Sequence, residues 1–265
     1  MSEPESRSWP GASWLRVALV AGVAAGLVAA AFNLGVGERV VDEAIALEPG
    51  HHGAVADDGG HTHVTAVAEP FTRGEQKGGM IIGQGVLGLA VGLLIAGAAL
   101  MVGKTRLTPQ RFWLALVGAG LWALLILPAV KFPPLPPGVE TALEVERRQV
   151  FYLLLVLAGL AGVLLASAVW TRLTGERERR VGRLGPRAVR AIAAAIALVV
   201  PAAAAFVLLP GDEIVTAVDG GLLARFRIVS IASQALFWVA LAGFGLWLLE
   251  HRRLPFLARR RAADA

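Results

Sequence analysis

Long apolar stretches without charged residues recur along the chain and alternate with shorter polar segments. A helix that crosses a hydrocarbon core of about 30 Å, at about 1.5 Å per residue, needs about 20 apolar residues. Six stretches reach this length. They run approximately from Leu15 to Leu34, Met80 to Val102, Phe112 to Val130, Val150 to Thr171, Ala188 to Leu209 and Ile228 to Leu249. This pattern predicts an all-α integral membrane protein, a bundle of six transmembrane helices.

Glycines four residues apart occur at three places in these stretches. The pairs are Gly22 with Gly26, Gly79 with Gly83, and Gly88 with Gly92. In lipid, this spacing lets two helix backbones approach closely, and its usual meaning is helix packing.

The composition agrees with a membrane protein and narrows the chemistry. Hydrophobic residues make up 56% of the 265 residues and charged residues 17%, and the mean hydropathy is +0.64. This balance is too apolar for a soluble domain of this length. The absence of cysteine excludes disulfides, thiolate metal sites and a cysteine nucleophile. Any metal must therefore be bound through nitrogen or oxygen.

The basic residues are distributed unevenly between the two sides of the predicted membrane domain. Segments on the side of the termini carry 17 of the 25 Lys and Arg residues, and segments on the other side carry 8. Cytoplasmic loops carry the excess of positive charge, so both termini are predicted to be cytoplasmic, an N-in/C-in orientation. The expected location is the inner (cytoplasmic) membrane. Topology explains the basic pI of about 10.6, so no nucleic-acid partner is expected.

This orientation divides the chain into a cytoplasmic N-terminus (1–14), a six-span membrane domain (15–250) and a basic cytoplasmic tail (251–265). Two extracytoplasmic loops stand out, a His/Asp-rich one over 35–78 and a Pro-rich one over 131–149. Fourteen of the 20 acidic residues fall outside the cytoplasm, which would concentrate cations there. The alternative is that acids fill the loops that arginine avoids.

Four of the five histidines lie in the first of these loops, in the stretch GHHGAVADDGGHTH. Imidazole suits zinc, copper, nickel and cobalt better than magnesium or calcium. The candidate metal ligands are His51, His52, Asp57, Asp58, His61 and His63. The spacing is not that of a structural zinc site, and the glycines leave the loop flexible. A low-affinity collector of ions fits this tract, and a disordered polar linker is the alternative.

The second loop and the last span carry further polar residues. The prolines from Pro128 to Pro137 are not expected to continue a helix, so a stiff polyproline-like or re-entrant segment is predicted. In the last span, Arg227, Ser230, Gln234 and Trp238 share one helical face. Polar groups at membrane depth face other helices or a water-filled path. The candidate residues for translocation or ion pairing are Glu38, Glu48, Lys131, Glu140, Arg147, Glu213, Arg227, Ser230 and Gln234.

A specific hypothesis links some of these residues. Arg227 and Lys131 would act as counter-ions that hold the carboxylate of Glu213 or Glu140, and the carboxylate would bind the ion. The alternatives are that Lys131 extends to lipid headgroups and that the stripe in the last span is a hydrogen-bonded seam between helices.

The chain has no GxxxxGK[ST] phosphate loop, no HExxH helix and no GxSxG elbow, so no catalytic residues are predicted and an enzyme is not expected. Its residues resemble the CbtA family of proposed cobalt transporter subunits over nearly the whole chain. The resemblance rests on Glu38 to Glu48, on Leu127 to Val139 with the sequence LPAVKFPPLPPGV, and on Phe226-Arg227 followed by Ser230, Gln234 and Trp238.

The resemblance implies uptake of Co²⁺ for cobalamin synthesis, often beside a small single-span, histidine-rich partner of the CbtB type. No permanently bound cofactor is implied, and the transported ion is Co²⁺, with Ni²⁺ or Zn²⁺ as alternatives. The expected partners are the lipid bilayer, a divalent metal ion and the CbtB-type subunit. Three functions remain open: a permease or permease subunit, a non-transporting scaffold or metal sensor that presents the histidine loop, and an intramembrane enzyme.

Overall fold

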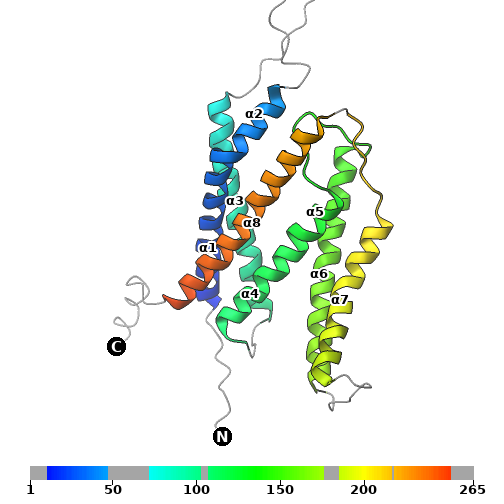
Figure 1. Cartoon of the computed structure of the whole chain (residues 1–265). Coiled ribbons are helices and arrows are strands. Elements are labelled where there is room, and N and C mark those ends of the chain that lie inside the picture. Colours follow the sequence, from blue (N-terminus) through cyan, green and yellow to red (C-terminus); the bar gives the residue numbers. More distant parts are fainter. Residues whose placement is uncertain (1–10, 47–71, 103–106, 176–184, 217, 252–265) are drawn as a thin grey trace, which may run out of the picture. The chain divides into compact units, whose positions relative to one another are not determined.

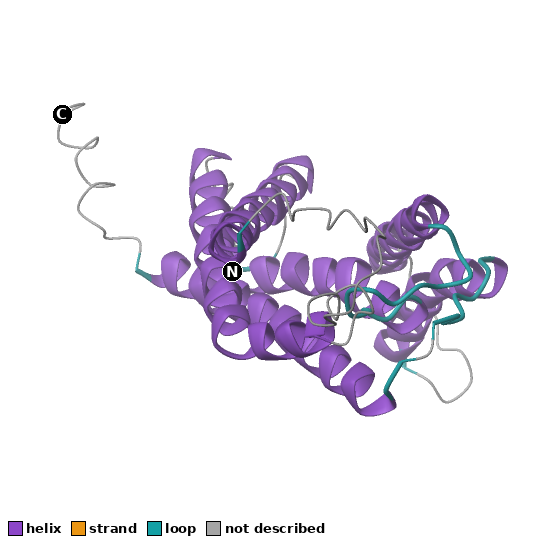
Figure 2. Cartoon of the chain, turned by 90° about the horizontal axis from the view of Figure 1, so that it is seen from above, coloured by secondary structure: helices purple, strands orange, loops and turns teal. Residues whose placement is uncertain are grey.

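The structure, a computed structural model, describes residues 11–46, 72–102, 107–175, 185–216 and 218–251 (Figure 1). Helices account for most of these residues, and no strand occurs among them (Figure 2). Six helical stretches are long and apolar enough to cross a membrane, so the six predicted spans are confirmed. They are Gly11–Ile45, Arg73–Val102, Pro109–Lys131, Val145–Leu173, Pro186–Leu208 and Gly220–Glu250.

The first span continues as a helix well beyond its apolar part. Helix α1 (Gly11–Phe32) leads into a π-helical turn, η1 (Asn33–Gly37), and then into α2 (Glu38–Ala46). Helix α3 (Arg73–Val102) begins before the second apolar stretch. Helix therefore covers both ends of the segment 35–78 that hydropathy predicts as loop, because hydropathy locates only the part of a helix that lies in lipid.

The third span ends one residue beyond its predicted end at Val130 and includes Pro128. It consists of α4 (Pro109–Gly120), a π-helical turn η2 (Leu121–Ile126) and α5 (Leu127–Lys131). The prediction that the prolines end the helix was wrong for Pro128, which is fully buried inside it. The reason is local. In the π-helical turn the N–H of Leu127 donates to the carbonyl of Trp122, five residues earlier, so the normal helical spacing is already relaxed here.

The carbonyl that Pro128 leaves without its helical donor has another partner. Proline has no N–H, so the carbonyl of Leu124, four residues earlier, cannot accept a bond from it. The hydroxyl of Tyr152, on α6 (Val145–Gly175), donates to this carbonyl at 3.1 Å. The helix ends at Lys131, and Phe132 leaves helical geometry with φ −123° and ψ 76°.

The chain divides into two compact units, each described here by itself. Unit 1 comprises the described parts of 1–117, 136–138 and 219–265, and unit 2 comprises 118–135 and the described parts of 139–218. The boundary falls within α4, between Val117 and Gly118.

In unit 1, α1 and α3 pack backbone against backbone through glycines. A Cβ atom on Gly22 or on Gly88 would collide with the carbonyl oxygen of the other, and one on Gly92 would collide with the carbonyl of Ala18. Two of the three predicted glycine pairs, Gly22 with Gly26 and Gly88 with Gly92, thus form the α1–α3 contact. Gly79 and Gly83 do not take part, because a Cβ on either would meet nothing within 4 Å.

Aromatic residues of α4 pack against the other helices of unit 1. The ring of Trp14 meets that of Phe112 edge to face, with centroids 5.3 Å apart. Trp113 is fully buried; its ring lies against Gly245 of α8 (Gly220–Glu250), and its indole nitrogen donates to the carbonyl of Ala242 at 3.2 Å. A side chain on Gly245 would occupy the place of this ring.

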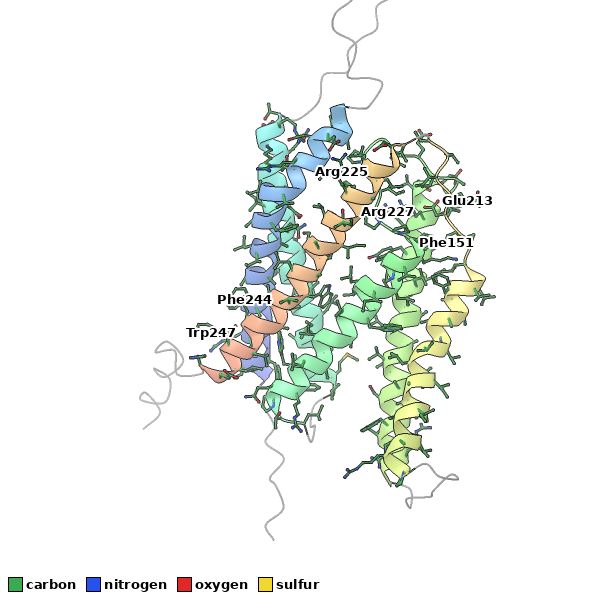
Figure 3. The ribbon with its side chains drawn as sticks, in the orientation of Figure 1. Phe151, Glu213, Arg225, Arg227, Phe244 and Trp247 are labelled. Atoms are coloured by element: carbon green, nitrogen blue, oxygen red, sulfur yellow. The ribbon has the colours of Figure 1, made fainter. Side chains whose placement is uncertain are left out.

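In unit 2, α5, α6 and α7 (Pro186–Leu208) share a small apolar core. Leu127, Phe132, Leu155 and Ala202 are buried in it, and Phe151 packs against them from α6 (Figure 3). Small residues again set the helix separation, because a Cβ on Gly159 would lie 3.0 Å from the Cα of Ala123. This packing brings the ends of α5 and α7 together at the candidate site.

Candidate functional site

Helix α2 carries acidic residues that pair with basic residues of α3. Glu38 and Asp42 lie four residues apart, as do Arg73 and Lys77, so each pair occupies one face of its helix. The guanidinium of Arg73 contacts the carboxylates of both Glu38, at 3.0 Å, and Asp42. Lys77 lies 3.5 Å from the same oxygen of Glu38, whose side chain is 14% exposed. One carboxylate oxygen of Glu38 is therefore shared by two basic groups.

A third acid of α2 connects it to α8. Glu43 accepts a bond from Arg225 at 2.6 Å, and both side chains are partly exposed. We call Glu38, Asp42, Glu43, Arg73, Lys77 and Arg225 the α2 ion-pair cluster. It ties α2 to two other helices of unit 1 by charge.

In unit 2, Arg148 and Asp212 form a buried contact beside the Pro-rich segment. Nε of Arg148 lies 2.9 Å from a carboxylate oxygen of Asp212, within ion-pair distance but without hydrogen-bond geometry, and the Asp212 side chain is only 3% exposed. A second nitrogen of Arg148 donates to the carbonyl of Pro133 at 3.0 Å. The backbone N–H of Leu143 donates to Asp212 at 3.4 Å. Arg148 thus connects the Pro-rich segment to the segment after α7.

Backbone pairing joins the same two segments. Thr141 and Ile214 form an isolated antiparallel bridge, in which Ala142 donates to the carbonyl of Glu213 and Val215 donates to that of Glu140. The hydroxyl of Thr216 accepts a bond from the N–H of Glu140 at 3.0 Å. Glu140 and Glu213 thus hold this structure through their main chains, while their side chains are exposed.

Lys131 caps the end of α7. Its ammonium donates to the carbonyl of Phe206 at 2.9 Å and lies 4.7 Å from the centre of the Phe206 ring. This carbonyl has no helical donor because residue 210, four positions later, is proline. A positive charge near a helix C-terminus also interacts favourably with the helix dipole. Lys131 is thus bound to a carbonyl, and not to a carboxylate.

The polar stripe of the last span lies on α8, in unit 1 (Figure 3). Arg227, Ser230 and Gln234 are each partly exposed. The Nε atom of Arg227 is buried without a hydrogen-bond partner among the described residues. Glu213 and Lys131, which the hypothesis placed with Arg227, belong to unit 2.

The remaining predicted residues are placed as follows. Arg147 is exposed and lies 3.4 Å from Glu144, the residue just before α6. Glu48 and the six predicted ligands of the histidine loop lie outside the described residues. Within the described ranges, no three His, Asp or Glu side chains are grouped closely enough to hold a metal ion.

Sequence reasoning missed the contacts that organise both regions. Arg148 and Asp212 are 64 positions apart, and Arg225 and Glu43 are 182 apart. No periodicity in a single sequence connects residues at such distances. The sequence does contain one indication of these contacts. Few basic residues are predicted on the extracytoplasmic side, so each one there is expected to have a specific partner. The four basic residues concerned are Arg73, Lys77, Arg148 and Arg225.

In the α2 ion-pair cluster and in the Arg148–Asp212 contact, the carboxylates already have basic partners. The carboxylates of Glu38 and Asp212 face guanidinium or ammonium groups, so an incoming cation would have to displace a basic side chain to reach them.

Comparison with known proteins adds the functional class. No curated protein and no solved structure matches the chain. The model of one family, described as probable cobalt transporter subunit (CbtA), matches residues 12–250, which include all six spans. The chain therefore belongs to the CbtA family.

Proposed function

We propose that this chain is a permease, or the membrane subunit of a permease, that takes up Co²⁺ across the inner membrane for cobalamin synthesis. The observation that carries the proposal is the family match over 12–250, since it covers the membrane domain as a whole and not one motif. Six helices long enough to span a bilayer fit this role.

The membrane potential can drive such uptake without an ATPase. A divalent cation that enters a cell with a negative interior gains about 4.6 kcal/mol per 100 mV, twice the value for a single charge. At about 1.4 kcal/mol per factor of ten, this supports roughly a thousandfold accumulation. The lack of a phosphate loop in the sequence is therefore compatible with transport.

We assign the histidine loop the role of collecting ions, because a glycine-rich tract with imidazole and carboxylate groups can raise the local metal concentration without forming a fixed site. Ni²⁺ and Zn²⁺ would compete with Co²⁺ for such ligands. A small single-span, histidine-rich subunit of the CbtB type is the expected partner.

Metal accumulation in intact cells tests the proposal. Cells that express the chain should accumulate more Co²⁺ than cells that carry an empty vector, at a rate that saturates with external Co²⁺. Replacing His51, His52, His61 and His63 together with alanine should raise the half-saturating concentration and leave the maximal rate largely intact. Loss of all uptake at saturating metal would place these histidines in the essential path. Equal accumulation with and without the chain would instead favour a scaffold or sensor.

A further inference from the structure

The first helical stretch contains a point at which it can bend, immediately before α2. In η1 the N–H of Glu38 donates to the carbonyl of Asn33, five residues earlier, so the turn is wider than an α-helical one. Such π-helical turns are a common cause of helix kinks. Gly35 lies within the turn, and a Cβ at this position would meet nothing within 4 Å. Among the described residues, no side chain therefore lies against the Cβ position of Gly35.

Beyond this point, ion pairs link α2 to α3 and α8, beside the packing of the buried Ala44. Glu38 and Asp42 bind Arg73 of α3, and Glu43 binds Arg225 of α8. The side chains of Asp42 and Arg225 are 52% and 55% exposed. Ion pairs with this exposure are individually weak and are screened by salt. The exposed pairs of Asp42 and Glu43 can thus separate without disturbing the glycine contacts between α1 and α3.

We propose that α2 is a movable latch that swings about η1 and is held closed by the α2 ion-pair cluster. Arg225 lies two residues before Arg227, on the opposite face of α8, so release of Glu43 frees the first turn of α8 and does not itself uncover the stripe. In the transporter proposed above, on which this functional part rests, the closed latch fixes this end of α8 and the open latch allows it to move.

The buried Ala44 of α2 reports whether the latch is closed. Its side chain is 3% exposed, and the chain has no native cysteine, so Ala44→Cys provides a single thiol that is shielded while α2 is in place. The rate of its labelling by a soluble thiol reagent then measures opening. Glu43→Gln and Arg225→Gln should each raise this rate by about two- to fivefold, as expected for loss of one exposed ion pair. High salt should raise the rate in the parent and remove most of the difference.

Stiffening the hinge should have the opposite effect. Gly35→Ala adds a methyl group in open space and favours regular helix, so it should slow the labelling of the thiol at position 44. Gly97→Ala is the matched control, because it also places a methyl group in open space, but near the C-terminal end of α3. It should leave the rate unchanged. Hydrogen exchange of the 38–46 backbone in the unsubstituted chain, at low and high salt, gives the same information if Ala44→Cys does not fold.

A bridging experiment separates the movement from its function. In the double variant Glu43→Cys/Arg225→Cys, a short bifunctional thiol reagent that can be cleaved by reduction would tie α2 to α8. Co²⁺ uptake should stop on bridging and return on reduction, while single-cysteine variants treated in the same way should not respond. Full uptake by the bridged protein would overturn the gating role. Labelling rates that are equal in the parent, in Glu43→Gln and in high salt would overturn the latch itself. If the unsubstituted chain gives no uptake, the transport proposal and the gating role fail together, and the labelling rates still decide whether α2 moves.

Discussion

At the scale of single residues, polar side chains of unit 2 bind carbonyls that prolines leave without their helical donors. Lys131 donates to the Phe206 carbonyl near Pro210, and Tyr152 donates to the Leu124 carbonyl near Pro128. The sequence places Lys131 correctly at the end of the third span, but it cannot give its partner, which lies 75 residues away. It also favours a carboxylate as partner, since Glu140 is close in the chain, whereas the structure provides a carbonyl.

Replacing Lys131 should therefore affect stability more than transport. Lys131→Met keeps the length of the side chain but leaves the carbonyl of Phe206 without its donor, and it should lower the free energy of unfolding by about 1 to 2 kcal/mol. Thermal unfolding of the purified protein in detergent measures this change. Arg147→Gln is the control, because Arg147 makes only an exposed pair and its loss should have no measurable effect. Normal stability of Lys131→Met combined with loss of uptake per molecule would contradict a structural role.

The Arg148–Asp212 contact should behave as a coupled pair. Asp212→Asn removes the charge of a side chain that is 3% exposed and leaves Arg148, which is 27% exposed, without compensation. We expect the free energy of unfolding to fall by about 2 to 4 kcal/mol. Breaking a fully buried ion pair usually costs somewhat more, but Arg148 is partly exposed to solvent. In the double variant Arg148→Gln/Asp212→Asn, the free energy of unfolding should fall by less than the sum of the decreases in the two single variants. Additive losses in the double-mutant cycle would show that the two side chains do not interact.

At the scale of helices, hydropathy predicts all six spans because crossing lipid requires a fixed length of apolar helix. It does not predict η1 and η2, because a π-helical turn changes the hydrogen-bond register and not the hydropathy. The glycine pairs show a similar limit, since spacing alone cannot tell Gly88, which faces α1, from Gly83, which faces open space.

Glycine substitutions test the α1–α3 contact. Gly88→Ala would place a methyl group against the carbonyl of Gly22, so the two helices must separate. We expect the free energy of unfolding to fall by about 1 to 3 kcal/mol. Gly83→Ala, on the same helix, meets nothing and should be neutral or slightly stabilising. Thermal unfolding of the two variants side by side provides the measurement. An equal effect of both would mean that close backbone approach does not hold α1 to α3.

At the scale of the whole molecule, the predicted orientation in the membrane rests on the unequal distribution of basic residues, 17 against 8. It predicts that position 53 lies outside the cell and position 182 inside. In a chain without native cysteine, Gly53→Cys should react with an impermeant thiol reagent in intact cells, and Gly182→Cys should react only after the membrane is opened. The reverse pattern of labelling would mean that the chain is inserted with both termini outside.

Function also belongs to this scale, because no group of described residues forms a metal site by itself, and the family match extends over all six spans. The most direct measurement is Co²⁺ uptake into sealed proteoliposomes with an imposed inside-negative potential, containing either the chain alone or the chain with a single-span CbtB-type partner. We predict uptake above that of protein-free liposomes, increasing with the potential toward roughly a thousandfold accumulation per 100 mV. Uptake no greater than that of protein-free liposomes, with the partner as well as without it, would contradict the account.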